Sequence, residues 1–240
     1  MSKMWTIGTE VAGMIVAHGK SYYNSEPEDY GTAAADLSRA ARGRAQTLRR
    51  SKLMIPSGLY FTKGVGRHKL KLASFELALR KAGIEKFNLV TVSSIFPPHC
   101  VVLKREMVVE KPGDGVKYIL SPGQIVYTVI ARNETNEHGR LISAGVGLAQ
   151  PIDPEMYGYL SEVHEFGMTT DKTSELAEDL AAEMLASTLG LAFDPDKSWN
   201  ERKEEWAIAG KIYRPRSIVQ AAKGEQKLWT SVVAAAIFVP

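Results

Sequence analysis

The strongest constraint on this chain is its alternation of short β-branched segments with two longer segments of helical periodicity. In the first of these, apolar residues recur every three or four positions and so lie on one helical face. They are Leu72, Phe75, Leu79 and Ala82. A helix is therefore predicted over 72–82, with Gly83 at its C-terminal cap. A second, longer amphipathic helix is predicted over 171–189.

Strands are predicted where β-branched and aromatic residues cluster between turn residues. The predicted strands are 59–62, 87–95, 101–110, 116–120, 124–132, 141–149, 157–163 and 228–239. We expect 124–132 and 141–149 to form a hairpin, with 133–139 as its loop. Gly145 and Gly147 lie within a predicted strand and indicate a bulge or a close backbone approach. Several strands with two helices indicate an α+β fold whose sheet faces are covered by helices.

Composition excludes several classes of chain. Hydrophobic residues make up 45% of the 240 residues and charged residues 24%, which excludes a disordered, collagenous or coiled-coil chain. The one cysteine, Cys100, has no partner for a disulfide within the chain, and the cytoplasm is the expected compartment. The longest apolar run, Val232–Val239, is far shorter than the roughly 20 residues that span a bilayer. We also expect no secretory signal and no membrane partner.

The positive charge is concentrated at the N-terminus. The net charge is +3, and residues 1–54 contain eight Lys and Arg against five Asp and Glu, so the rest of the chain is neutral. A neutral body argues against a dedicated nucleic-acid-binding domain. We therefore treat 1–54 as a basic extension and 55–240 as one domain. The Arg-rich segment 32–52 is compatible with an arm for RNA or another anionic partner, or with a solvated helix.

Familiar catalytic and metal motifs are missing from the sequence. The five histidines do not pair at metal-ligand spacing, and there is no Gly-x-Ser-x-Gly nucleophile motif. Gly64-Val65-Gly66 lacks the third glycine of a dinucleotide-binding loop, and we interpret it as a turn within a basic loop over 63–71.

One dipeptide offers a different chemistry. Ser93-Ser94 ends the apolar segment 87–95 and lies just before Pro97-Pro98. In a strained Ser–Ser bond the Ser94 hydroxyl attacks the Ser93 carbonyl carbon and forms an ester; elimination then leaves dehydroalanine, which hydrolyses to a pyruvoyl group. The reaction needs a hydrogen-bond donor near the carbonyl. Asn88 lies on the same predicted strand face as Ser94. Two strand-end hydroxyls bonded to the backbone are the alternative interpretation.

Residues 55–98 together resemble the pyruvoyl-dependent arginine decarboxylases. The matching features are the Gly64 turn, the helix 72–79, Ala82-Gly83-Ile84, Asn88-Leu89 and Ser93-Ser94-Ile95 before Pro97-Pro98. The resemblance continues through 158–162, the helix 171–189 and the terminal strand 232–238. It thus covers residues 55–240, and residues 1–54 have no counterpart.

The resemblance implies a proenzyme that cuts itself between Ser93 and Ser94. The products would be a β chain, 1–93, and an α chain, 94–240, whose first residue becomes a covalent pyruvoyl cofactor. It also implies a four-layer αββα sandwich with mostly antiparallel sheets. Protomers would assemble as a homo-trimer or hexamer, with active sites between neighbouring subunits. The implied reaction converts arginine to agmatine and CO2 for polyamine synthesis.

The resemblance also assigns roles to individual positions. Glu162 matches the proton donor, with Glu165 as a nearby rival, and Asn88 matches a residue needed for efficient self-processing. The carboxylate that binds the substrate guanidinium is an aspartate in the family, and Glu76 stands here, one methylene longer. The remaining positions matched to the substrate site are Leu72, Leu79 and Ser93.

Two alternatives stay open on the sequence. The longer side chain of Glu76 leaves room for another basic amino acid, such as histidine, as the substrate. A non-cleaving homologue that serves as a binding or assembly module is the second alternative, with the basic arm 39–52 touching RNA or another chain. Retention of Ser93, Ser94, Asn88 and Glu162 together speaks against that second alternative.

Overall fold

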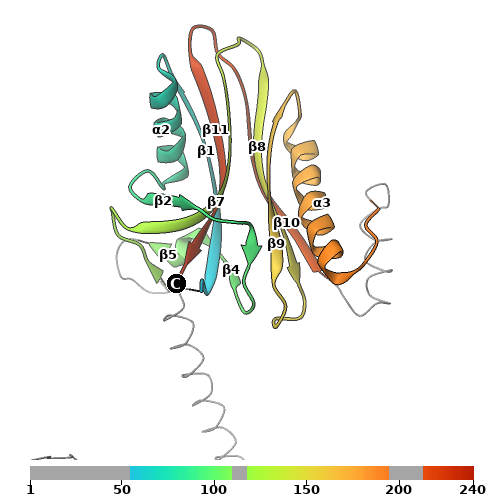
Figure 1. Cartoon of the computed structure of the whole chain (residues 1–240). Coiled ribbons are helices and arrows are strands. Elements are labelled where there is room, and N and C mark those ends of the chain that lie inside the picture. The colour runs from blue at the N-terminus through green and yellow to red at the C-terminus, as the bar shows by residue number, and fades with distance from the viewer. Residues whose placement is uncertain (1–54, 110–117, 195–212) are drawn as a thin grey trace, which may run out of the picture. The chain divides into compact units, whose positions relative to one another are not determined.

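The computed structural model describes residues 55–109, 118–194 and 213–240, and these residues build four layers (Figure 1). The two helices are α2 (Lys71–Ala82) and α3 (Thr170–Leu189), and η1 (Arg105–Met107) is a short 3-10 turn. The strands are β1 (Gly58–His68), β2 (Asn88–Thr91), β3 (Ile95–Phe96), β4 (Val101–Leu103), β5 (Val108–Val109), β6 (Tyr118–Ile119), β7 (Ile125–Thr135), β8 (Leu141–Pro151), β9 (Gly158–Phe166), β10 (Tyr213–Lys223) and β11 (Trp229–Val239). Expectations for 1–54, and for residues 110 and 116–117 of the predicted strands, fall outside the described residues.

Two sheets lie face to face between the helices. The first has the strand order β2-β7-β11-β1-β4 and the second β10-β8-β9-β3, while β5 and β6 form a separate pair. Most neighbours are antiparallel; β1 with β4, β2 with β7 and β5 with β6 run parallel. The largest apolar cluster fills the space between the sheets and includes Leu59, Val129, Val146, Leu160 and Phe238. The predicted α+β sandwich with mostly antiparallel sheets is confirmed.

Glycines bring each helix close to its sheet. A Cβ atom on Gly64 would lie 2.1 Å from the carbonyl oxygen of Ala78 in α2, and one on Gly66 would lie 2.1 Å from that of Ser74. A Cβ atom on Gly147 would lie 2.0 Å from the carbonyl oxygen of Ala177 in α3. The close approach expected at Gly147 is confirmed. The loop predicted over 63–71 is wrong, because β1 continues through both glycines to His68.

Both predicted helices form and end where expected. Gly83 follows α2 in the left-handed region at φ 68°, and its N–H donates to the carbonyl of Arg80. Thr169 caps the start of α3 by accepting a hydrogen bond from the N–H of Lys172. Gly190 ends α3 in the same way as Gly83 ends α2. No helix in the described ranges has both the length and the apolar content that a membrane crossing requires.

The predicted hairpin between β7 and β8 is wrong. β7 pairs with β2 and β11 in the first sheet, whereas β8 pairs with β9 and β10 in the second. The short connection between them therefore carries the chain from one sheet to the other. Nearly every residue of β8 is buried, because one of its faces meets the first sheet and the other meets α3. Both arrangements use a short turn between two apolar segments, so the sequence pattern alone does not distinguish them.

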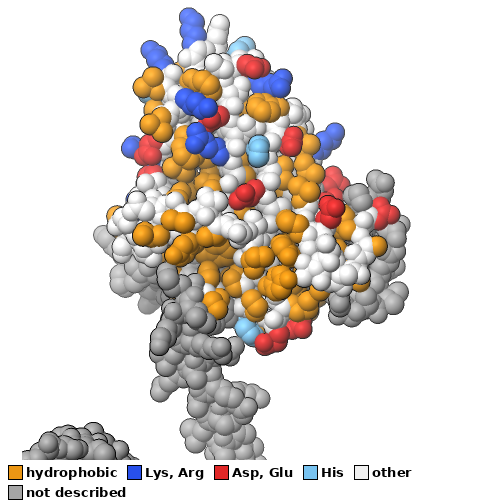
Figure 2. Space-filling view, viewed as in Figure 1, with side chains coloured by type: hydrophobic (Ala, Val, Ile, Leu, Met, Phe, Trp, Pro, Cys, Tyr) orange, Lys and Arg blue, Asp and Glu red, His pale blue; other side chains and the backbone are white. Residues whose placement is uncertain are grey.

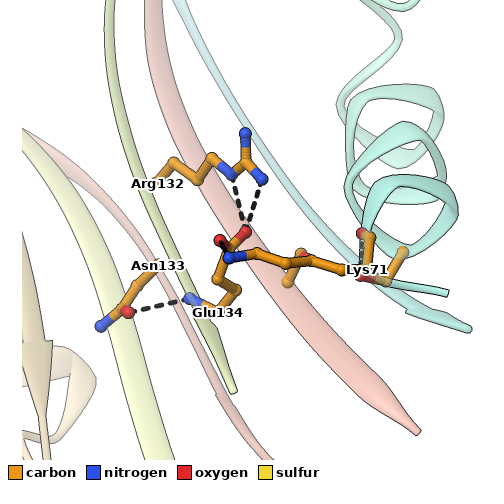
Figure 3. Close-up of polar contacts among 6 residues, drawn as sticks. Lys71, Arg132, Asn133 and Glu134 are labelled. Atoms are coloured by element: carbon orange, nitrogen blue, oxygen red, sulfur yellow. Dashed lines mark hydrogen bonds and ion pairs between the residues drawn. The ribbon is translucent and has the colours of Figure 1, made fainter. Parts of the chain in front are cut away.

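The polar contacts of Glu134 fasten α2 to the first sheet (Figure 3). Its carboxylate accepts hydrogen bonds from Arg132 Nε and Nη2 at 2.8 and 2.6 Å and also forms an ion pair with Lys71 of α2. The Arg132 guanidinium lies 3.7 Å from the ring centroid of Phe75. Burial alone would raise the pKa of Glu134, but the hydrogen bonds and charges of Lys71 and Arg132 hold it below the ordinary 4.5.

We expect Glu134→Gln to lower the free energy of unfolding by about 1 kcal/mol at neutral pH. A lowered pKa in the folded state stabilises above the unfolded-state pKa, and this stabilisation is lost as the pH falls through the folded-state pKa. The difference between wild type and variant should therefore shrink between about pH 5 and pH 3. Urea unfolding at several pH values measures it. Glu137→Gln, an exposed carboxylate outside the described ion pairs, is the control, and an equal pH dependence in that variant would contradict the expectation.

Candidate active site

The Ser93–Ser94 bond lies where the chain crosses from the first sheet to the second. A continuous strand over 87–95 was predicted, but β2 ends at Thr91 on the edge of the first sheet and β3 begins at Ile95 on the edge of the second. The carbonyl of Ser93 accepts a hydrogen bond from the Ile95 N–H at 2.8 Å, which makes a three-residue turn around Ser94. The strand was predicted as continuous because most residues of 87–95 are β-branched or apolar, whereas the break comes from pairing with two different sheets.

Each side of the crossing is anchored to a different sheet. On the N-terminal side, the Val92 N–H donates to the carbonyl of Thr128 in β7 at 3.1 Å. On the C-terminal side, the carbonyl of Ser94 accepts from the Leu160 N–H in β9 at 2.7 Å. Neither hydrogen bond belongs to the peptide group between Ser93 and Ser94. Breaking that peptide bond therefore leaves both of these anchoring hydrogen bonds in place.

Glu162 lies in the same gap between the edges of the two sheets. β2 pairs with β7 as far as Thr128, so the next edge N–H of β7, that of Ile130, has no strand partner there. The Glu162 carboxylate accepts this N–H at 3.2 Å and so bridges β9 to β7. Glu162 is exposed in the single chain, but partial burial of its carboxylate raises its pKa above the ordinary value. This effect outweighs the Ile130 hydrogen bond and the His164 charge, which lower the pKa. A carboxyl group that keeps its proton to higher pH is suited to donate one.

Glu165 lies on the opposite face of β9. The Ser161 hydroxyl donates to the carbonyl of Ala177 in α3 at 2.5 Å, so this face of β9 is the helix-covered one. Side chains alternate along a strand, so Glu165 shares the face of Ser161, whereas Glu162 shares the inter-sheet face of Leu160. Of the two carboxylates that the sequence left open, Glu162 is the one in the crossing gap.

Asn88 lies at the far end of β2 from the cleavage candidate. Its side-chain amide donates to the carbonyl of Gly123 at 2.7 Å, and its N–H donates to the carbonyl of Gln124 at 2.9 Å. Ser93 follows it by five residue steps, a span of roughly 16 Å for an extended chain. Within one chain the side chain of Asn88 therefore anchors the turn before β7, and its part in self-processing stays a prediction.

The predicted substrate-binding residues on α2 are not brought to the crossing within one chain. Glu76 pairs with Arg80 of the same helix at 3.1 Å, and Leu72, one turn earlier, has 77% of its surface exposed. Leu79 packs against the apolar cluster beneath α2. α2 lies on β1 and β11 of the first sheet, whereas Ser94 is bonded to β9 of the second.

Sequence reasoning missed the backbone groups of the site. The N–H groups of Ile130 and Leu160 hold Glu162 and Ser94, and every residue type except proline carries such a group. It also missed His99, which lies in the left-handed region at φ 59° just after β3. The His99 side chain lies 3.2 Å from the Glu155 carboxylate, and its N–H donates to the carbonyl of Pro154. The turn after β3 is thereby tied to the loop before β9.

Comparison with known proteins assigns the chain to a family. The family model described as pyruvoyl-dependent arginine decarboxylase (PvlArgDC) matches residues 58–240. The probable pyruvoyl-dependent arginine decarboxylase of Chlorobium limicola is 55% identical over 186 residues, which is 78% of this chain and 98% of the relative. The pyruvoyl-dependent arginine decarboxylase of Methanococcoides burtonii is 50% identical over 187 residues, 78% and 99% of the two chains. That of Nitrosopumilus maritimus is 46% identical over 185 residues, 77% and 97% of the two chains.

The family match makes this chain a pyruvoyl-dependent decarboxylase, a carbon–carbon lyase. More closely, the chain belongs to the pyruvoyl-dependent arginine decarboxylase family, whose members depend on a covalently bound pyruvoyl group.

Proposed function

We propose that this chain cuts itself between Ser93 and Ser94 and then decarboxylates arginine to agmatine and CO2, a reaction that serves polyamine synthesis. The carrying observation is the crossing itself: a Ser–Ser bond between two anchors, with the Glu162 carboxyl group in the same gap. Family membership supports arginine over histidine, because the relatives are named arginine decarboxylases. The presence of Ser93, Ser94, Asn88 and Glu162 together favours a processed enzyme over a non-cleaving binding module.

Residue 94 fits a covalent pyruvoyl group. The group would be built from Ser94 itself: Ser94 Oγ bonds to the Ser93 carbonyl carbon as the Ser93–Ser94 C–N bond breaks. Loss of the Ser94 α-proton and cleavage of its Cβ–Oγ bond would then release Ser93 as a carboxylate, and water would replace the nitrogen as ammonia. The Ser94 carbonyl is held by Leu160 through a bond that this chemistry leaves intact. The new chain end would therefore stay beside β9.

Glu162 is the proposed proton donor of the decarboxylation. The pyruvoyl group supplies a ketone that condenses with the substrate amine and takes up the electron pair left when CO2 departs. The substrate α-carbon then needs a proton, and Glu162 would supply it from the inter-sheet face of β9. Its raised pKa keeps the acid form available at higher pH than for an ordinary glutamate.

The substrate site would be completed between subunits. Glu76 carries the carboxylate for a guanidinium group, and Leu72 and Leu79 offer apolar surface for the substrate stem. These residues lie on α2, which packs on the opposite sheet from β9 in the same chain, so we propose that α2 of one protomer serves the Ser94 of a neighbour. Ser93, exposed at the end of the β chain, would also face the substrate.

We propose that protomers assemble as a homo-trimer or a hexamer, as the family resemblance implies, and apolar surface around the crossing supports a contact between subunits there. Figure 2 shows hydrophobic side chains gathered over the lower part of the visible face, around β2, β4 and β9, and Lys and Arg gathered over α2. Exposed large apolar residues in elements next to the crossing are Val90, Ile95, Val101, Ile152 and Tyr157. Such a patch marks a contact surface when its members adjoin a functional site.

We also propose that residues 55–240 form the catalytic domain and that it acts in the cytoplasm. The family match begins at residue 58, close to the proposed boundary, and leaves residues 1–54 as an extension. A single cysteine, buried in the described structure, fits a reducing compartment.

Self-cleavage is the first test of this proposal. Denaturing mass spectrometry of the purified chain should show fragments 1–93 and 94–240, the second blocked at its N-terminus and trapped by a carbonyl-reactive reductant. Ser94→Ala removes the attacking hydroxyl and should stay intact. Ser93→Ala keeps the attacked carbonyl and should still be cut. A wild-type chain that stays intact on prolonged incubation would overturn the proposed function and bring the binding module forward.

The proton donor is tested by two glutamine substitutions on β9. Glu162→Gln should lower kcat by about 10²- to 10⁴-fold, the usual contribution of a positioned acid. Glu165→Gln should leave kcat within roughly threefold, because its side chain lies on the helix-covered face. Single-turnover CO2 release from arginine, on protein shown to be cleaved, measures both. The reverse pattern would exchange the two roles.

The substrate is tested through Glu76. We expect CO2 release from arginine and little from histidine, and Glu76→Ala should raise KM for arginine by roughly 10- to 100-fold, since a hydrogen-bonded charge pair is lost. Glu76→Asp should keep most of the affinity. Glu85→Ala, an exposed carboxylate after α2, is the control. Equal KM values in all these variants would remove Glu76 from the substrate site, and preference for histidine would support the other substrate.

A further inference from the structure

The Leu160 N–H donates a hydrogen bond to Ser94, the residue that would become the pyruvoyl group. Cleavage breaks the bond between Ser93 and Ser94, but the carbonyl that Leu160 holds belongs to the next peptide group, Ser94–Ile95. After processing, this oxygen belongs to the amide carbonyl group, whose carbon is bonded to the keto carbon. In the uncut chain the Leu160 nitrogen lies 2.7 Å from this oxygen, an atom that processing would make conjugated with the keto group.

The residue that carries this N–H donor is buried and held in place. Leu160 is fully buried, at 0% exposure, and belongs to the apolar cluster between the sheets. β9 pairs there with β8, Leu160 opposite Leu148, so the strand that carries the N–H is held on its other edge as well. The Ile95 N–H already donates to Ser93 within the turn. A preorganised N–H in an environment of low dielectric constant stabilises developing negative charge more than water does.

We propose that the backbone N–H of Leu160 is an oxyanion donor for the decarboxylation step. The inference deepens the proposed function and rests on residue 94 becoming the pyruvoyl group. The pyruvoyl group would supply the electron sink when the bond between the substrate α-carbon and its carboxylate breaks and CO2 leaves. The Leu160 N–H would stabilise the negative charge that the electron pair places on the amide oxygen of residue 94. Glu162 would then give its proton to the α-carbon, which regains the electron pair.

One strand would thus deliver both the hydrogen bond and the proton. Leu160 and Glu162 are two residues apart on β9, and residues at this spacing lie on one face, roughly 7 Å apart. Glu162 is in turn held by the Ile130 N–H of the other sheet. The stabilised oxygen and the protonated carbon belong to the same conjugated unit, so a rigid strand suits the placement of both groups.

The test removes this one N–H. Cell-free synthesis of the full chain with a suppressor tRNA carrying the α-hydroxy analogue of leucine replaces the amide at Leu160 by an ester. We expect cleavage between Ser93 and Ser94 as in wild type, with kcat for arginine lowered by about 10²-fold and KM little changed. The control is the same replacement at Gly167, whose N–H donates to the carbonyl of Leu141 at 2.8 Å at the far end of β9. It should keep kcat near the wild-type value.

A second readout does not depend on activity. Serine labelled with ¹³C at the carbonyl and isoleucine labelled with ¹⁵N mark two peptide bonds in this chain, Ser94–Ile95 and Ser217–Ile218. In the cleaved protein without substrate, the Leu160 ester should move the residue 94 carbonyl to higher infrared frequency and lower ¹³C chemical shift, and the Ser217 signal should stay unchanged. If the ester variant fails to fold, the unmodified cleaved protein decides, because a residue 94 carbonyl with the frequency of a free amide overturns the proposal.

The outcomes separate this inference from the function on which it rests. A wild-type chain that is neither cleaved nor active overturns both. A cleaved, active enzyme whose Leu160 ester keeps kcat within about twofold, or loses no more than the Gly167 ester, overturns the donor role alone. A selective loss of kcat together with the carbonyl shift supports it.

Discussion

Close contact between helix and sheet backbones is the constraint on which this fold depends. Gly64 and Gly66 lie against carbonyl groups of α2, and Gly147 lies against one of α3. This seating covers the outer face of each sheet and leaves the inner faces to meet around one apolar cluster. Larger residues at these glycines would push the helices outward and expose the alanine-rich strand β11, which is buried along nearly all its length.

The site is a consequence of having two sheets. A chain that must pass from the edge of one sheet to the edge of the other leaves a short segment outside regular pairing, and here that segment contains Ser93-Ser94. Because β2 ends early, the Ile130 N–H of β7 has no strand partner on that edge, and it donates to the Glu162 carboxylate of β9. The Ser93–Ser94 bond and the Glu162 carboxyl group thus lie between the same two sheet edges because one strand ends early. The topology explains this placement, and no sequence motif joins the two positions.

The sequence predicted elements whose signals are local and missed those decided by distant pairing. Both helices were found because apolar spacing and capping glycines agree, as at Gly83. The β7–β8 hairpin was wrong because sheet assignment depends on partners far along the chain. β10 was missed because its first residues, including Arg214 and Pro215, do not look like a strand, and Pro is tolerated there at a sheet edge. At the site, resemblance located Ser94 and Glu162, whereas the Leu160 and Ile130 backbone groups carry no sequence signal.

The sheet order has a consequence for how the mature protein could be made. β1 comes from the piece before Ser94, yet it lies between β11 and β4, which both come from the piece after it. A cut at the crossing would leave two polypeptides interleaved in one sheet, so they would not separate without unfolding. Refolding after denaturation would then be a bimolecular encounter that depends on concentration, whereas the first folding is unimolecular. The cut protein would keep the fold that its uncut precursor had formed. The lifetime of that folded state would be set by the rate of unfolding.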